Sequence, residues 1–342
     1  MDRRKFIAGA VAAPTVLLAS PAIVTAAPLV EWRMQTAFSP FSLAHASAQK
    51  FADKMRQKTG GQFDISVFSA GELVAASELL NAVRGGPLQC AQLVLGDYYE
   101  AEDKALIFGS GVPFGLTPAQ HYSWWREHGG KIVNRVLART GLMAIPCGDL
   151  GQQTGGWYNR RVRRPADLDG LKIRATSLGA DIMDRLGMSV TELSAAEIYA
   201  ALAVGIIDAA DHVNFHDDTL LGLDEVAGHC YRHAWWETNA MVQLVVNREE
   251  WQDLPAAYRT AIKQACAAAH ARLLGQYNRA NRTALQNVKA QGEVAVRDYP
   301  SSILKAARKA SNAEMKEIAA GNADFRRAWR SLKAYKATLS AG

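Results

Sequence analysis

The sequence contains little cysteine and none of the short motifs that mark common enzyme classes. The four cysteines, Cys90, Cys147, Cys230 and Cys266, are far apart and form no CxxC pair, so neither a structural zinc site nor a thioredoxin-type site is indicated. A core of this size needs no disulfides, and we expect buried free thiols. G-x-S-x-G, G-x-x-x-x-G-K-[ST], H-E-x-x-H and a strand-following G-x-G-x-x-G are also absent. These absences favour a binding protein over an enzyme, and we predict no catalytic residues.

Dense basic runs and long apolar runs are missing as well. The formal net charge is +6, but the Lys and Arg residues are scattered, which disfavours nucleic-acid binding. After the N-terminal segment no stretch approaches the roughly 18 consecutive apolar residues of a membrane-spanning helix. With 342 residues and 49% hydrophobic content, the chain can fill two lobes with apolar cores.

The first 26 residues have the pattern of an export signal. Charged residues including Arg3 and Arg4 precede a short apolar stretch, and small residues end at Ala26. The paired arginines resemble a twin-arginine signal, although Asp2 departs from the usual pattern, so the Sec route stays open. We therefore predict a signal peptide over residues 1–26 and a periplasmic protein.

Hydrophobic periodicity predicts a lobe built from alternating strands and helices. Strands are expected at 30–35, 63–68 and 89–95, and helices at 42–59 and 72–84. Strands that alternate with helices in this order form a parallel sheet with right-handed crossovers. The N-terminal lobe is predicted to span residues 27–150.

The rest of the chain predicts a second α/β lobe and a helical end. Expected strands at 142–147, 155–158 and 171–174 would cross between the lobes, and the strand at 241–247 would return. Further helices are expected at 180–186 and 195–204, with strands at 189–193 and from Asp208. Residues 151–247 would form the second lobe with its hinge crossings. Residues 248–342, with helices at 254–288 and 303–335, would pack on both lobes. The predicted fold class is α/β, two lobes with a ligand site between them at strand ends.

Two histidine pairs offer an alternative function. His212 and His216 are four residues apart, and so are His229 and His233, a spacing that could bind a transition metal if each pair lay on a helix. The stretch after His212, with Asn214 and Phe215, has the character of a loop instead. Transition-metal cargo is therefore an alternative to the main hypothesis.

Three stretches carry a family resemblance. They are DLDGLKIR at 167–174, EIYAALAVGIIDAAD at 197–211 and GVPFGL at 111–116. Together they resemble the DctP-type solute-binding proteins of TRAP (tripartite ATP-independent periplasmic) transporters, over nearly all of the chain after residue 26. GQQTGGW at 151–157 and the run Trp235-Trp236-Glu237 resemble the branch that binds 2-oxo and 2-hydroxy monocarboxylates.

The resemblance implies a set of site residues. Arg174 would bind the ligand carboxylate, because a planar guanidinium matches a carboxylate bidentately. Its alternative role is a surface ion pair with Asp167 or Asp169. The other expected ligand contacts are Gln153, His212, Tyr98, Tyr99, Asn214 and Trp236.

The resemblance also implies a bound cation. Its expected ligands are Gln153, Asp211, His212 and Glu237, and Na⁺ or Ca²⁺ would offset the repulsion between these carboxylates and an acidic ligand. His212 stands where the branch has Trp, and Asn214-Phe215 replace its Gly-Pro, so ligand identity stays open. A protonated His212 is the alternative source of positive charge.

The implied function is capture of a small organic acid and its delivery to the membrane subunits of a TRAP permease, without a catalytic cofactor. A ligand sensor for a membrane kinase would share the same pocket and is a further alternative. The sequence leaves a monomer and a homodimer equally open.

Overall fold

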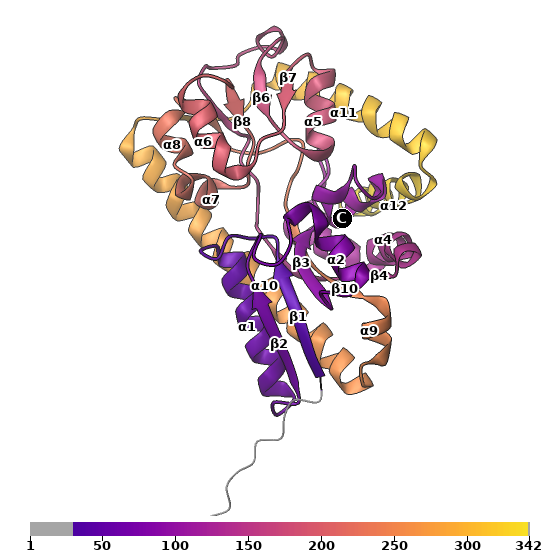
Figure 1. Ribbon diagram of the computed structural model, residues 1–342. Coiled ribbons are helices and arrows are strands. Elements are labelled where there is room, and N and C mark those ends of the chain that lie inside the picture. The colour runs from indigo at the N-terminus through magenta and orange to yellow at the C-terminus, as the bar shows by residue number, and fades with distance from the viewer. Residues whose placement is uncertain (1–29, 341–342) are drawn as a thin grey trace, which may run out of the picture.

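The computed structural model describes residues 30–340, so the signal peptide expected at 1–26 lies outside the described residues. Two sheets organise the chain into two lobes (Figure 1). Each sheet is covered by helices, which confirms the predicted α/β two-lobed fold class.

The first lobe is built on a five-stranded sheet with the order β2-β1-β3-β10-β4. β1, β2 and β3 are parallel, as the alternation of strands and helices predicts, whereas β10 runs antiparallel to both β3 and β4. The strands are β1 (Val30–Thr36), β2 (Phe63–Phe68), β3 (Cys90–Val94), β4 (Leu142–Asp149) and β10 (Met241–Asn247). β3 is buried throughout and β10 is buried up to its last residue, because helices cover both faces of the sheet centre.

The second lobe is built on a six-stranded sheet of shorter strands with the order β11-β9-β5-β8-β6-β7. β5 is antiparallel to its neighbours β8 and β9, and the other pairs are parallel. The strands are β5 (Trp157–Tyr158), β6 (Lys172–Arg174), β7 (Ser189–Thr191), β8 (Ala209–Ala210), β9 (His229–Tyr231) and β11 (Ala295–Arg297).

The helices are α1 (Leu43–Lys58), α2 (Leu79–Gly85), α3 (Pro118–Trp124), α4 (Gly130–Leu137), α5 (Ser177–Arg185), α6 (Ala195–Ala203), α7 (Phe215–Leu220), α8 (Leu223–Val226), α9 (Arg248–Asp253), α10 (Ala256–Gln291), α11 (Ser301–Gly321) and α12 (Ala323–Ser340). Local chemistry sets several of their ends. The Ser42 hydroxyl accepts from the His45 amide at the start of α1, and Gly292 follows α10 with φ 77°. Short 3₁₀ turns include η2 (Leu95–Tyr98) and η3 (Lys104–Gly109).

Four sequence predictions differ from the structure. The strands expected at 142–147, 155–158 and 171–174 do not cross between the lobes, because β4 lies within the first sheet and β5 and β6 lie within the second. The helix expected at 72–84 begins only at Leu79, after a 3₁₀ turn at Ala76–Glu78. The helix expected at 303–335 is two helices, because the chain leaves the helical conformation at Asn322, whose side-chain oxygen accepts from the Phe325 amide. The stretch after Asp211, expected to be a loop, contains the short helix α7.

Two extended segments connect the lobes. Residues 150–156 lead from β4 to β5, and residues 232–240 return from β9 to β10. They lie side by side, since Leu150 N donates to Ala240 O at 2.9 Å and Ala234 N to Gln153 O at 3.2 Å. We call these two segments the hinge segments.

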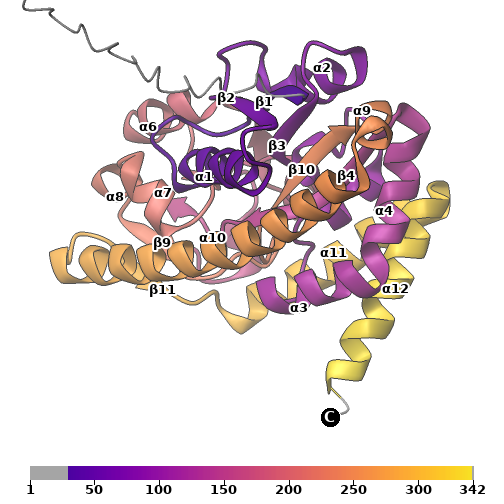
Figure 2. The same cartoon turned by 90° about the horizontal axis from the view of Figure 1, so that it is seen from below.

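The C-terminal helices also cross between the lobes. α10 contacts α1 and β4 of the first lobe at one end and α7 of the second at the other, and Figure 2 shows it as one long helix. α11 packs on α5 of the second lobe, whereas α12 packs on α4 of the first. None of the helices in the described chain combines the length and apolar character that a membrane crossing requires. All four cysteines are buried free thiols, as expected.

Candidate functional site

Arg174 stands at the end of β6 and is held in place by backbone oxygens. Its Nε donates to Leu193 O at 3.1 Å and its Nη1 to Asp211 O at 2.7 Å. These bonds fix the plane of the guanidinium, and within residues 30–340 its Nη2 has no hydrogen-bond partner, so one side of the fork remains available. Neither alternative ion pair is formed among the described residues: Arg174 has no salt bridge to Asp167 or Asp169, and Asp167 instead accepts from the Arg164 side chain and the Arg163 amide.

Two carboxyl groups, those of Asp97 and Asp211, lie near this cation, and Glu237 lies near both of them. Burial raises the pKa of Asp211 to about 7 and partial desolvation raises that of Asp97 to about 6, although Arg174 lowers both. Burial, and then the neighbouring Asp97 and Asp211, raise the pKa of Glu237 well above its usual range. Charged groups of one sign in low-dielectric surroundings favour protonation or an added positive charge. The site therefore has more acidic groups than its own basic residue can balance.

Asp97 is exposed to solvent, and Arg174, His212 and Glu237 are half-buried. Desolvation is nevertheless the largest influence on the pKa of Asp97, His212 and Glu237. Asp97 lies on η2 of the first lobe and Arg174 on β6 of the second, so the cluster contains residues of both lobes.

Three of the residues expected in the site carry a buried polar atom that lacks a partner. These atoms are Gln153 Nε2, Asp211 Oδ1 and Trp236 Nε1. The Trp236 indole lies beside Asp211 and favours its charged form, but makes no hydrogen bond of ordinary geometry. Buried polar groups are nearly always satisfied, so several unsatisfied ones in one place indicate a ligand or an ion.

The hinge segments carry these residues into the site. Gln153 lies on the first segment, and Trp236 and Glu237 lie on the second. The first segment is fixed to the loop after β8, since Thr154 N donates to Val213 O at 3.2 Å. Buried Asp218 ties the same region together by accepting from Thr154 Oγ1 at 2.8 Å and Trp157 Nε1 at 2.7 Å.

His212 follows Asp211 and faces the same cluster. Burial, and then the positive charge of Arg174, lower the pKa of His212 to about 3, so its imidazole is neutral near pH 7. The lowered pKa therefore disfavours a protonated His212 as the source of positive charge. The neutral ring can still donate a hydrogen bond or act as a ligand.

The other expected ligand contacts have their polar groups engaged within the protein. Asn214 caps α7, since its Oδ1 accepts from the Asp217 amide at 3.0 Å, and its Nδ2 donates to Leu150 O at 3.0 Å. The Tyr98 hydroxyl donates to Ala76 O at 2.5 Å, and the Tyr99 hydroxyl donates to Asp181 at 3.0 Å. The structure thus brings Arg174, Asp211, His212, Trp236 and Glu237 together and places Gln153 on the adjoining hinge segment, while Asn214, Tyr98 and Tyr99 bond to other parts of the protein.

Sequence reasoning missed Asp97. It follows β3, and the rule that ligands bind beyond the carboxyl ends of strands could have found it.

A hard cation fits this donor set in part. The carboxylates of Asp211 and Glu237 and the amide of Gln153 offer oxygen ligands, provided that the amide is turned to present its oxygen. Within the described residues, however, no three His, Cys, Asp or Glu side chains converge on one point. A cation here would need ligand oxygens as well. The same finding disfavours the histidine pairs as a transition-metal site.

Comparisons with known proteins identify the family. Residues 34–322 match the family model described as bacterial extracellular solute-binding protein, family 7, DctP. The chain is 34% identical to the monocarboxylate 2-oxoacid-binding periplasmic protein of Nostoc sp. strain PCC 7120, across 100% of this chain and 95% of that protein.

Two solved structures are similar in fold and sequence. A TRAP solute-binding protein from Bordetella bronchiseptica has a TM-score of 0.86 and 32% identity over 92% of this chain and 94% of its own, and is a mixed-occupancy dimer with calcium and picolinate in one active site. One from Pseudoalteromonas atlantica, with bound sodium and pyruvate, has a TM-score of 0.85 and 25% identity over 91% and 95%. The chain belongs to the DctP family of TRAP transporter solute-binding proteins.

Proposed function

We propose that this protein captures a small 2-oxo or 2-hydroxy monocarboxylate, or a related small acid, in the periplasm and delivers it to a TRAP permease. The observation that carries the proposal is the fixed guanidinium of Arg174 beside unpartnered buried polar atoms of Asp211 and Trp236, with a third such atom on Gln153 of the first hinge segment. The arrangement offers a fixed guanidinium to a carboxylate and leaves other polar atoms for its second functional group.

A bridging Na⁺ or Ca²⁺ ion is part of the proposal. The acidic side chains Asp97, Asp211 and Glu237 already exceed the single Arg174, and a carboxylate ligand would add another negative charge. A cation held by Gln153, Asp211, Glu237 and the ligand would reduce that excess of negative charge and favour ionised carboxyl groups. Calcium and sodium in the two solved relatives support this choice.

Export to the periplasm and delivery to a transporter are part of the same proposal. The family consists of extracellular solute-binding proteins, which act as receptors. The sequence pattern at residues 1–26 supports export to the periplasm. A kinase-sensor role would use the same site, but the transporter family gives it no support. The dimer of the Bordetella relative makes a homodimer a possibility to test for this chain.

The test is a binding screen on the protein without residues 1–26. Pyruvate, lactate and picolinate would each be titrated calorimetrically with Ca²⁺, with Na⁺ and with a chelator. We expect at least one acid to bind, binding to weaken with the chelator, and Arg174→Ala to abolish it. Binding of zinc or nickel without any binding of carboxylates would contradict the proposal.

A further inference from the structure

Two short segments, one from each lobe, meet at the edge of the site. Residues 96–104 of the first lobe include Asp97, and residues 174–181 of the second begin at Arg174. Ser177 Oγ, at the start of α5, donates to Gly96 O at 2.8 Å. Within the first lobe, a Cβ at position 96 would lie 2.2 Å from Ser110 Oγ, so the packing of this segment on Ser110 favours glycine.

Ser177 also has strained backbone geometry. Its φ of 57° is in the left-handed region, which residues other than glycine adopt at a cost of order 1 kcal/mol. Strain of this kind persists only where surrounding contacts offset it. Only Ala175 and Thr176 stand between Arg174 and this strained residue, so the turn that aims α5 at the first lobe directly follows the carboxylate-binding candidate.

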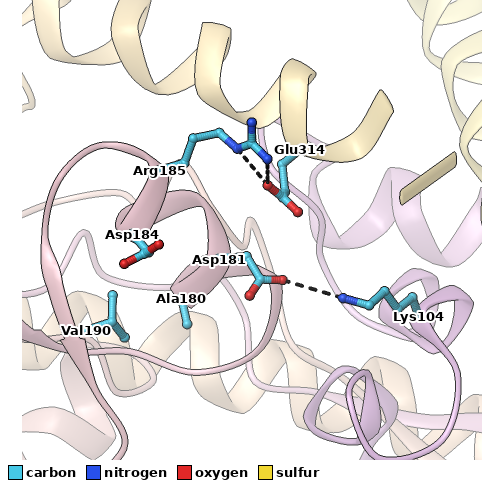
Figure 3. A pocket seen from close by; sticks show the side chains of 7 residues that line it. All are labelled: Lys104, Ala180, Asp181, Asp184, Arg185, Val190 and Glu314. Carbon is cyan, nitrogen blue, oxygen red and sulfur yellow. Dashed lines mark hydrogen bonds and ion pairs between the residues drawn. The ribbon is translucent and has the colours of Figure 1, made fainter. Parts of the chain in front are cut away.

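A second set of contacts joins the same segments one helical turn further on. The Tyr99 hydroxyl, on a fully buried side chain, donates to Asp181 Oδ2 at 3.0 Å. Lys104 Nζ lies 4.0 Å from the same carboxylate and 4.6 Å from the centre of the Tyr99 ring. Figure 3 shows Asp181 on α5 and Lys104 on the first lobe pointing toward each other beside a pocket of about 530 Å³.

We propose that Tyr99, Asp181 and Lys104 form an interlobe latch that controls how fast the ligand leaves. The latch positions Arg174 indirectly: β6, the strained turn and α5 form one continuous unit, so holding Asp181 against the first lobe also holds Arg174 there. If ligand release requires the lobes to separate, it must break the latch, whereas ligand entry into separated lobes does not. This inference rests on the proposed function.

A double-mutant cycle on the dissociation rate tests the latch. Tyr99→Phe removes only the hydroxyl, and Asp181→Ala removes its acceptor. With pyruvate and picolinate as probes in the presence of Ca²⁺, each single variant should release the probe about fivefold faster, with an unchanged association rate. The double variant should release it no faster than the more affected single variant, because both changes remove the same bond.

The cycle also separates the latch from a direct ligand contact. If Tyr99 acted on the ligand itself, the effect of Tyr99→Phe would persist in the Asp181→Ala background, and additive effects would overturn the proposal. The matched control is Arg185→Gln, on the same helix and at the same pocket. Arg185 pairs with Glu314 at 2.6 Å on α11, which packs on the second lobe, so release should change less than twofold.

A measurement without ligand completes the design. Spin labels would be attached to cysteines introduced at two exposed positions, Glu78→Cys on the first lobe and Glu192→Cys on the second. Double electron–electron resonance then measures the distribution of distances between the two labels. The latch predicts that Tyr99→Phe broadens this distribution toward longer distances and that Arg185→Gln does not. An unchanged distribution would overturn the latch whether or not a probe binds. Failure of the wild-type protein to bind either probe would count against the proposed function alone.

Discussion

Arg174→Lys is the most informative single substitution at this site. Lysine keeps the positive charge but cannot hold the two backbone oxygens, Leu193 O and Asp211 O, while also binding a carboxylate with two parallel bonds. A hydrogen bond to a charged group contributes about 1.5–3 kcal/mol, so loss of one such bond corresponds to roughly a 10- to 150-fold weaker Kd. Isothermal titration of pyruvate or picolinate at saturating Ca²⁺ measures this directly.

Two comparison variants separate the effect of guanidinium geometry from the effect of charge. Arg164→Lys changes an exposed residue that pairs with Asp167 at 3.3 Å on the surface near β6, and binding should stay within twofold of wild type. Arg174→Ala, which also removes the charge, should bind more weakly than Arg174→Lys. An Arg174→Lys protein that binds the acid within threefold of wild type would refute the bidentate role.

Three further predictions concern stability and the cation. Burial raises the pKa of Asp149 to about 7. Between about pH 4 and pH 7 the folded protein therefore keeps a proton on Asp149 that the unfolded chain has lost. The stability that this carboxyl group contributes is complete below about pH 4 and is lost as the pH rises to about 7. Chemical denaturation of Asp149→Asn should therefore show a gain over wild type that grows across this range, up to an order of 4 kcal/mol, and a constant difference would contradict the assignment. Gln153→Ala should weaken binding in Ca²⁺ much more than in chelator, as measured by titration in both; equal losses would argue against Gln153 as a cation ligand. Asn214→Ala should lower unfolding free energy by about 1–2 kcal/mol through loss of the α7 cap, equally with and without ligand, so a larger loss with ligand in thermal unfolding would indicate a ligand contact.

The sequence alone determined much of the architecture. Period-two alternation located β1 and β2, and the helical spacing of apolar residues located α1, with the glycine pair at positions 60 and 61 marking its end. These features are local, because a strand or a helix end depends on residues within a few positions of one another. The runs that carry the family resemblance contain Arg174 and Asp211, and the resemblance implied that both residues belong to the site.

Only the tertiary structure decided which polar groups remain available there. Tyr99 and Asp181 are 82 positions apart, and Asn214 and Leu150 are 64 apart, so no local pattern could show that they bond to each other. Asp97 becomes part of the site only because the second lobe brings Arg174 toward it. The availability of a side chain depends on every neighbour that folding brings to it, and those neighbours come from distant parts of the chain.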